Sequence, residues 1–172
     1  LKSLLTQAKV AIEMPKRERE DEIKSEEDAW AITIAEADRQ LSAGLLCPVE
    51  LLEACWSRLE ETEPDLNSFV ALEKREVCLK AAQESRERCL RRSRLGPLDG
   101  VPLALKDVID TKGLTTSAGA AVYRDRVPEE DANVVAKLKA AGAVIIGKTF
   151  TTEFATFGIC NPSYRQLQTR CP

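Results

Sequence analysis

The chain has 172 residues, enough for one domain with a hydrophobic core or for part of a larger one. Its 25 basic and 28 acidic residues are well mixed and give a net charge of -3. This balance argues against nucleic-acid binding, because proteins that bind nucleic acids usually carry a strongly basic face. No apolar stretch approaches the roughly 20 residues that a transmembrane helix needs, so the sequence predicts no membrane span.

The sequence contains no histidine, and its six cysteines are scattered without a Cys-x-x-Cys pair. Without histidine, acid–base chemistry must use Lys, Asp, Glu, Tyr or Cys. Neither a disulfide framework nor a zinc site is expected from such cysteines. We therefore expect reduced thiols, a cytoplasmic location with organelles left open, and no metal or cofactor. The cysteines are Cys47, Cys55, Cys78, Cys89, Cys160 and Cys171.

Residues 1–28 differ from the rest of the chain. Most positions from Glu13 to Asp28 are charged, and too few are apolar to bury one face of a helix. Such a composition is typical of a solvated helix or a disordered leader.

Two amphipathic helices should follow. The first is expected over 29–43, with Asp28 as its N-terminal cap and Gly44 ending it. The second should begin at Pro48, because proline is well tolerated in the first turn, and should end at Pro64. Both have apolar residues at helical spacing, which gives each helix a face to bury. The expected inward residues are Trp30, Ile34, Ala37 and Leu41 in the first helix, and Leu52, Cys55 or Trp56, and Leu59 in the second.

A short extended segment over 67–71 should lead into a long charged helix over 72–93. The basic run at its end, from Arg86 to Arg94, suits the negative end of the helix dipole. We interpret this run as a solvated helix end rather than as a site for polyanions.

The character of the sequence changes after Gly96. Residues 103–109 predict a strand that is apolar on both faces, and 143–146 predict a second buried strand. Between them lies a helix over 132–141 with Asp131 as its cap. Strand, crossover helix and strand imply a parallel pair. The predicted fold class is α/β, in which N-terminal helices precede the start of a mixed, largely parallel sheet with crossover helices.

Lys106 lies inside the apolar run Val101-Pro-Leu-Ala-Leu-Lys-Asp-Val-Ile109. If both faces of the strand are covered, its ammonium must find a partner or lose its proton, and a neutral lysine can act as a general base. Alternatively, the strand ends at Leu105 and Lys106 reaches water, since lysine is rarely buried without a reason. Asp107 is a poor partner for Lys106, because neighbouring strand residues point to opposite faces.

The segment from Gly96 to Gly119 resembles the lysine-bearing segment of the amidase-signature family. The resemblance spans about 29–164 in order, and a run of this length is highly specific. The segments that carry it are Gly96-Pro-Leu-Asp-Gly-Val-Pro-Leu-Ala-Leu-Lys-Asp-Val-Ile-Asp-Thr-Lys-Gly-Leu-Thr-Thr-Ser-Ala-Gly119, Asp131-Ala-Asn-Val-Val, Ala141-Gly-Ala-Val-Ile-Ile-Gly-Lys-Thr149, Glu153-Phe-Ala155 and Asn161-Pro162, with Pro48-Val-Glu-Leu and Asn67-Ser-Phe-Val before them.

The resemblance implies a Ser-cisSer-Lys triad, of which only the lysine maps onto this chain, at Lys106. A neutral Lys106 would take a proton through a bridging serine and so activate a serine nucleophile. Residues 165–172 depart from the family pattern, and the serine-bearing segment Gly-Gly-Ser-Ser-Gly-Gly-Ser does not occur. Neither Ser117 nor Ser163 matches a catalytic position. We therefore expect 29–164 to be the N-terminal part of an amidase domain, 165–172 to be foreign to it, and this chain to be inactive alone.

By this resemblance, the parent protein is expected to hydrolyse C–N bonds in small-molecule amides. An alternative is the amidase-type subunit of a tRNA-dependent amidotransferase, which uses the same kind of site to release ammonia from glutamine. A third interpretation is a non-catalytic truncated product with part of its sheet uncovered. Homo-oligomerisation is left open.

A competing motif lies in Gly142-Ala-Val-Ile-Ile-Gly-Lys-Thr149, which fits the P-loop pattern G-x-x-x-x-G-K-[ST]. A phosphate-binding loop needs a strand before the first glycine and a helix after the lysine. Here a helix is expected before Gly142, and the residues between the glycines favour a strand. The sequence therefore does not favour nucleotide binding.

Overall fold

The computed structural model describes residues 26–156. Residues 1–25 of the predicted leader 1–28 and the whole predicted tail 165–172 lie outside these described residues. The elements in chain order are the 3-10 helix η1 (Glu26–Ala31), α2 (Ile34–Ala43), α3 (Pro48–Leu66), β1 (Phe69–Leu72), α4 (Arg75–Leu90), β2 (Pro102–Lys106), η2 (Ala121–Tyr123), α5 (Asn133–Ala140), β3 (Val144–Thr149) and η3 (Glu153–Ala155).

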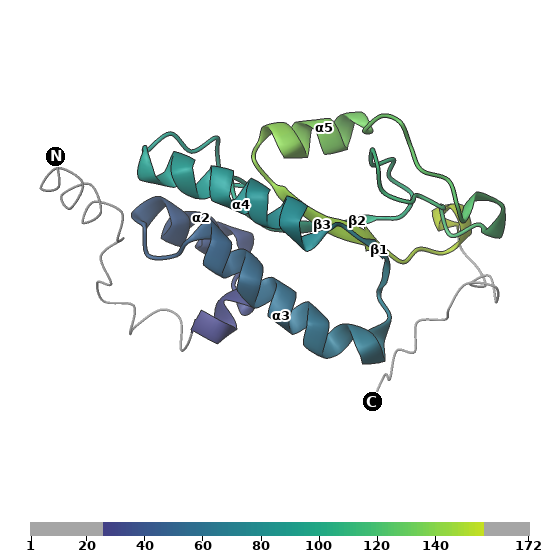
Figure 1. Ribbon diagram of the computed structural model, residues 1–172, viewed down its shortest axis with the longest axis horizontal. Helices are drawn as coiled ribbons and strands as arrows, with labels where there is room; N and C mark the ends of the chain where they lie inside the picture. The colour runs from purple at the N-terminus through teal and green to yellow at the C-terminus, as the bar shows by residue number, and fades with distance from the viewer. Residues whose placement is uncertain (1–25, 157–172) are drawn as a thin grey trace, which may run out of the picture.

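The three described strands form one mixed sheet in the order β1-β3-β2. The central strand β3 is parallel to β2 and antiparallel to β1. Helix α5 connects the two parallel strands and lies on the opposite side of the sheet from α3 (Figure 1). The predicted α/β class, with helices before a mixed sheet and a crossover helix, is confirmed.

Two apolar clusters cover the two faces of the sheet. On one face, Val144 of β3 packs with Leu52 and Trp56 of α3 and with residues of α4. On the other face, Ile145 of β3 packs with Val135 of α5. Neighbouring strand residues thus enter different clusters, as the alternation of side chains in a strand requires. A further cluster joins η1, α2 and the start of α3.

A bulge interrupts the alternation in β3. Leu103 pairs with Ile145, but the next residue of β2, Ala104, pairs with Gly147, so Ile146 is an extra residue. The shift places Lys148 opposite Leu105, whose side chain belongs to the cluster under α5. On the other side of β3, the backbone of β1 passes very close to Gly147. A Cβ at this position would lie 2.5 Å from the carbonyl oxygen of Ala71, so glycine permits this contact.

The predicted first helix is wrong at its beginning. The chain forms η1 and then starts α2 at Ile34, capped by Thr33, whose hydroxyl accepts a hydrogen bond from the Glu36 backbone N–H at 3.2 Å. The N-cap is therefore Thr33, five residues after the predicted Asp28. The predicted end is confirmed, because Gly44 caps α2 with a φ of 70°. In the predicted stripe, Ala37 and Leu41 are buried, whereas Trp30 and Ile34 are exposed.

Other helix boundaries also differ from prediction. Helix α3 begins at Pro48 as expected but continues through Pro64 to Leu66, because a proline in the last turn removes only one backbone hydrogen bond. Its inward residues Leu52, Trp56 and Leu59 are buried. Helix α4 is shorter than predicted at both ends.

Helix α5 is not capped by Asp131. Its N-cap is Ala132, whose side chain makes no capping hydrogen bond. The Asp131 carboxylate instead accepts a hydrogen bond from the backbone N–H of Lys112 at 2.8 Å and pairs with Lys139 at 2.7 Å. It therefore ties the loop after β2 to α5.

Candidate active site

Lys106 is the last residue of β2, at the edge of the sheet where the carboxyl ends of the two parallel strands meet. It pairs in register with Thr149, and its side chain is exposed. The strand does not run on to residue 109, because the Ile109 backbone N–H donates to the Lys106 carbonyl at 3.0 Å and closes a turn. Among the described residues, then, the Lys106 ammonium reaches solvent. Its catalytic role stays a prediction.

Asp107 points away from Lys106 into the protein, as the alternation of a strand predicts. Its side chain is fully buried. The carboxylate accepts hydrogen bonds from the Ser117 backbone N–H at 3.1 and 3.2 Å and from the Ser117 hydroxyl. On the backbone, the Asp107 N–H donates to the carbonyl of Thr149, and the Asp107 carbonyl accepts from Ala118. Asp107 therefore holds the returning loop against the end of β2.

Lys148 is the buried lysine of this region. Its side chain is fully inaccessible, and its Nζ donates to the carbonyl oxygen of Ile109 and to the hydroxyl of Thr116, each at 2.6 Å. The nearest carboxylate oxygen, on Asp107, is 3.7 Å away. Burial lowers the pKa of Lys148, and the charge of Asp107 opposes that shift. The ammonium thus lies in a polar pocket closed by the loop after β2.

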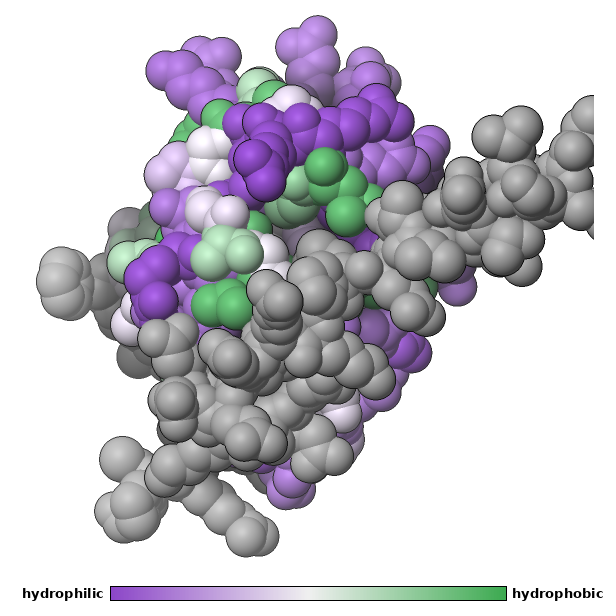
Figure 2. Space-filling view, turned by 90° about the vertical axis from the view of Figure 1, so that its left-hand side faces the viewer, coloured by the Kyte–Doolittle hydropathy of each residue, from purple (hydrophilic) through white to green (hydrophobic). Residues whose placement is uncertain are grey.

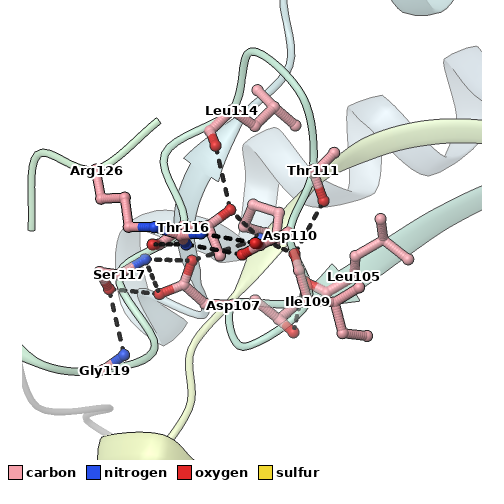
Figure 3. A network of polar contacts seen from close by, with 12 residues as sticks. Leu105, Asp107, Ile109, Asp110, Thr111, Leu114, Thr116, Ser117, Gly119 and Arg126 are labelled. Carbon is pink, nitrogen blue, oxygen red and sulfur yellow. Dashed lines mark hydrogen bonds and ion pairs between the residues drawn. The ribbon is translucent and has the colours of Figure 1, made fainter. Parts of the chain in front are cut away.

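The same loop carries a second ion pair nearer the surface. The two oxygens of Asp110 accept from the two terminal nitrogens of Arg126 at 2.7 and 2.6 Å, and Arg126 also donates to the Thr116 carbonyl (Figure 3). The hydrogen bond from Arg126 lowers the pKa of Asp110. Gly119 lies at the end of this network and has a φ of +67°, which favours glycine. A Cβ at this position would also lie 2.7 Å from the carbonyl oxygen of Thr151.

The P-loop interpretation does not fit this arrangement. Residues from Val144 to Thr149, including both Gly147 and Lys148, form strand β3, and helix α5 precedes Gly142. Backbone N–H groups that are paired in a sheet cannot surround a phosphate, and the Lys148 ammonium is already occupied inside the protein.

The basic end of α4 is largely neutralised within the chain. Arg88 pairs with the buried Asp99 at 2.7 Å, and Arg94 pairs with Asp38 at 2.6 Å. Hydrophilic side chains cover much of the visible surface at this end of the molecule (Figure 2). These contacts favour the solvated helix end over a polyanion site.

Cys47, Cys55, Cys78 and Cys89 are free thiols. Burial raises the pKa of both Cys55 and Cys78 to about 11, so these thiols stay protonated and unreactive at neutral pH. Within residues 26–156 no group of three or more His, Cys, Asp or Glu side chains could hold a metal ion. In this same range no helix is both long and apolar enough to cross a bilayer.

The sequence interpretation missed the structural importance of Lys148, which it considered only as part of a P-loop. The one signal was a lysine after an apolar run, but Val144-Ile-Ile-Gly precedes the buried Lys148 just as Leu103-Ala-Leu precedes the exposed Lys106, so the pattern does not separate the two. Thr116 and the Asp110–Arg126 pair carried no comparable signal, because their contacts join residues that are distant in the chain.

Comparison with known proteins identifies the family. The family model described as Amidase matches residues 50–172. A glutamyl-tRNA(Gln) amidotransferase subunit of Chloroflexus aurantiacus is 41% identical over 138 residues, which cover 80% of this chain and 28% of that protein. The same subunit of Streptomyces coelicolor is 39% identical over 128 residues, covering 74% of this chain and 26% of the relative.

Comparison with solved structures also finds amidases. The peptide amidase of Stenotrophomonas maltophilia superposes with a TM-score of 0.64 at 33% identity, covering 70% of this chain and 25% of that one. A fatty acid amide hydrolase superposes with a TM-score of 0.67 at 24% identity, covering 73% and 22%, which supports the fold alone. The chain belongs to the amidase-signature family.

The chain spans only about a quarter of the length of the curated relatives it matches, 28% in the first case. The family match also runs through 165–172, the segment predicted to be foreign to the family. The domain boundaries at 28 and 164 therefore stay predictions.

Proposed function

We propose that residues 29–164 form the N-terminal part of an amidase domain whose parent protein hydrolyses a C–N bond in a small-molecule amide, in the cytoplasm. The observation that carries the proposal is the place of Lys106 in a chain of this family, at the carboxyl end of β2 with its ammonium open to solvent. Ligands gather at the carboxyl ends of parallel strands in α/β proteins, because the loops that follow the strands meet there.

In the proposed mechanism, Lys106 is the general base. It accepts a proton through a bridging serine from a serine nucleophile, which attacks the amide carbonyl, and backbone N–H groups hold the resulting oxyanion. A lysine acts as a base only in its neutral form, so the base function requires that further protein cover Lys106 and disfavour its charge. We expect the serine-bearing segment to provide that cover.

A chimera tests the role of Lys106. Residues 29–164 of this chain would replace the matching part of the Chloroflexus aurantiacus relative, which restores the rest of the domain. We expect release of ammonia from a primary amide, and a loss of at least about 1,000-fold in kcat/KM in Lys106→Ala, since loss of the base removes activation of the nucleophile. Lys112→Ala, at an exposed loop position, is the matched control and should keep its activity. A Lys106→Ala chimera as active as this control contradicts the proposal.

The second candidate function is that of the amidase-type subunit of a tRNA-dependent amidotransferase. The curated relatives favour it, because the Chloroflexus and Streptomyces proteins are both glutamyl-tRNA(Gln) amidotransferase subunits. The peptide amidase among the solved structures favours the first candidate. Completing residues 29–164 with the Chloroflexus relative and, separately, with the peptide amidase separates the two, because the segment should support more turnover in the relative whose function it shares.

The 172-residue chain alone should be inactive, because it supplies the lysine without the serines that the family uses. Purified chain incubated with a simple amide is expected to release no ammonia above the buffer rate. Turnover that disappears in Lys106→Ala contradicts this expectation. Size-exclusion chromatography and circular dichroism of the same sample separate a folded monomer or homo-oligomer from an aggregated, non-catalytic product.

A further inference from the structure

Buried polar contacts hold the backbone of Lys106 on the side that faces the protein interior. The Lys106 carbonyl accepts from Ile109, and the next residue, Asp107, bonds through its backbone to Thr149 and Ala118. These bonds form one turn at the end of β2. The Ile109 carbonyl of this turn and the Thr116 hydroxyl of the loop after it both accept a hydrogen bond from the Lys148 ammonium.

Lys148 connects three parts of this turn and loop. Its Nζ donates to Ile109, the residue whose N–H closes the turn on Lys106, and to Thr116 in the returning loop. It also lies 3.7 Å from the carboxylate of Asp107, the residue next to Lys106. One buried cation thus bridges the turn, the loop and the strand end, while Lys106 projects from the other side.

We propose that Lys148 is a positioning residue for Lys106, acting through the Asp107–Ile109 turn. The inference rests on the proposed function, in which Lys106 is the base. A base must be held within a fraction of an ångström of the group that it serves, and residues with their own hydrogen-bond support hold such positions best. The Lys148 contacts supply that support without touching the face where Lys106 points.

The charge of Lys148 is essential to this role. A neutral side chain in the same place would leave the Asp107 carboxylate buried without its cation and the Ile109 carbonyl without its donor. The other charged groups near the ammonium are Asp110 and Arg126, which largely neutralise each other. An apolar residue of similar length would fill the space but would not fasten the turn.

Two variants of the full 172-residue chain test the proposal without requiring turnover. Lys148→Met removes the cation, and Thr116→Val removes one acceptor while keeping both charges and nearly the same shape. Lys137→Met, at an exposed position of α5, is the matched control. Hydrogen exchange is measured at the amides of Asp107, Ile109 and Ala118 and at amides of α3. In parallel, acetylation of Lys106 by acetic anhydride is followed against pH by peptide mass spectrometry.

We expect Thr116→Val to speed exchange at the three turn amides by about ten-fold while α3 exchanges as before. In Lys148→Met the same amides should exchange faster still. The rate of Lys106 acetylation should also change by about two-fold or more across the profile, because a turn without its support no longer holds the Lys106 side chain in one environment. Lys137→Met should change neither measurement.

Unchanged exchange at the turn amides in Thr116→Val overturns the proposal, and this holds even if Lys148→Met fails to fold. So does faster exchange that spreads equally to α3, since that reports general destabilisation. A folded Lys148→Met with an unaltered Lys106 profile also overturns it. Failure of the proposed function is distinguishable, because it appears as an inactive chimera while these local effects remain.

Discussion

The helical layer and the loop after β2 use opposite kinds of contact. In the layer from η1 to α4, the buried residues are mostly apolar, and ion pairs such as Arg58–Glu61 lie in solvent, with side chains 40% and 69% exposed. Beneath the loop, by contrast, Lys148 of β3 and Asp107 are both 0% exposed, while the Asp110–Arg126 pair of the same loop lies nearer the surface. An exposed ion pair contributes little to stability, whereas removal of one member of a buried pair leaves an uncompensated charge. The two regions should therefore respond very differently to the loss of one charge.

The largest effect is expected from Lys148→Met. This change removes the ammonium that donates to Ile109 and Thr116 and lies beside the Asp107 carboxylate. We expect the free energy of unfolding to fall by about 3–5 kcal/mol, the usual result of breaking a buried pair. Urea denaturation followed by circular dichroism measures it. Lys139→Met makes the same change in a more exposed pair with Asp131 and should cost about 1 kcal/mol or less. Equal losses in the two variants would show that burial does not decide the cost of losing one charge.

An intermediate effect is expected at Asp99, whose buried carboxylate is the exception in the helical half of the chain. Burial alone would raise its pKa, but hydrogen bonds from Arg88 and the Leu95 backbone N–H outweigh burial and lower the pKa below its ordinary value of 3.8. The charged form is therefore favoured by folding. The stabilisation is complete above pH 3.8 and is lost as the pH falls through the lower folded-state value.

Asp99→Asn should lower the free energy of unfolding at neutral pH by about 1–3 kcal/mol, since hydrogen bonds to a charged group are lost. It should also weaken the acid dependence. Urea midpoints measured from neutral pH down to about pH 3 test both expectations. A variant whose midpoints fall with acid as steeply as those of the parent chain shows that Asp99 does not contribute this dependence.

The smallest effect is expected from Glu61→Gln in α3. Its partner Arg58 also lies over the ring of Trp30, 4.7 Å from the centroid, and keeps that contact. The free energy of unfolding should change by about 0.5 kcal/mol or less in the same urea assay. A loss of more than about 1 kcal/mol indicates that the surface pairs of the helical layer act as a network.

Sequence patterns predicted the elements better than their ends. The crossover from β2 through α5 to β3 follows from apolar runs separated by a helical period, and Gly44 and Pro48 mark boundaries through their own backbone preferences. The predictions of Asp28 and Asp131 as caps were wrong. Thr33 is the N-cap of α2, and the Asp131 carboxylate pairs with Lys139 instead of capping α5. A local sequence pattern does not show which of several possible side chains will make such a contact.

For the site, the sequence predicted a strand that runs through Lys106 to Ile109, which is wrong because β2 ends at Lys106, and it separated Lys106 from Asp107, which the structure confirms. The solvent exposure of Lys106 was one of two interpretations that the pattern left open. The enclosure of Lys148 was not predicted, because it depends on the loop returning to place Thr116 beside β3 and on a bulge that no periodicity reveals. Burial of a charge is a property of the assembled fold.

The extra residue at Ile146 makes the spacing of β3 as important as its composition. Exchange of Ile146 for another apolar side chain would keep every later residue in frame. If instead the bulge closed and Ile146 paired with Ala104, the remainder of the strand would turn by half a period, and the Lys148 ammonium would point towards the apolar cluster that contains Trp56 and Cys78. The burial of the Lys148 ammonium therefore depends on the register of β3 as well as on the side chains that line it.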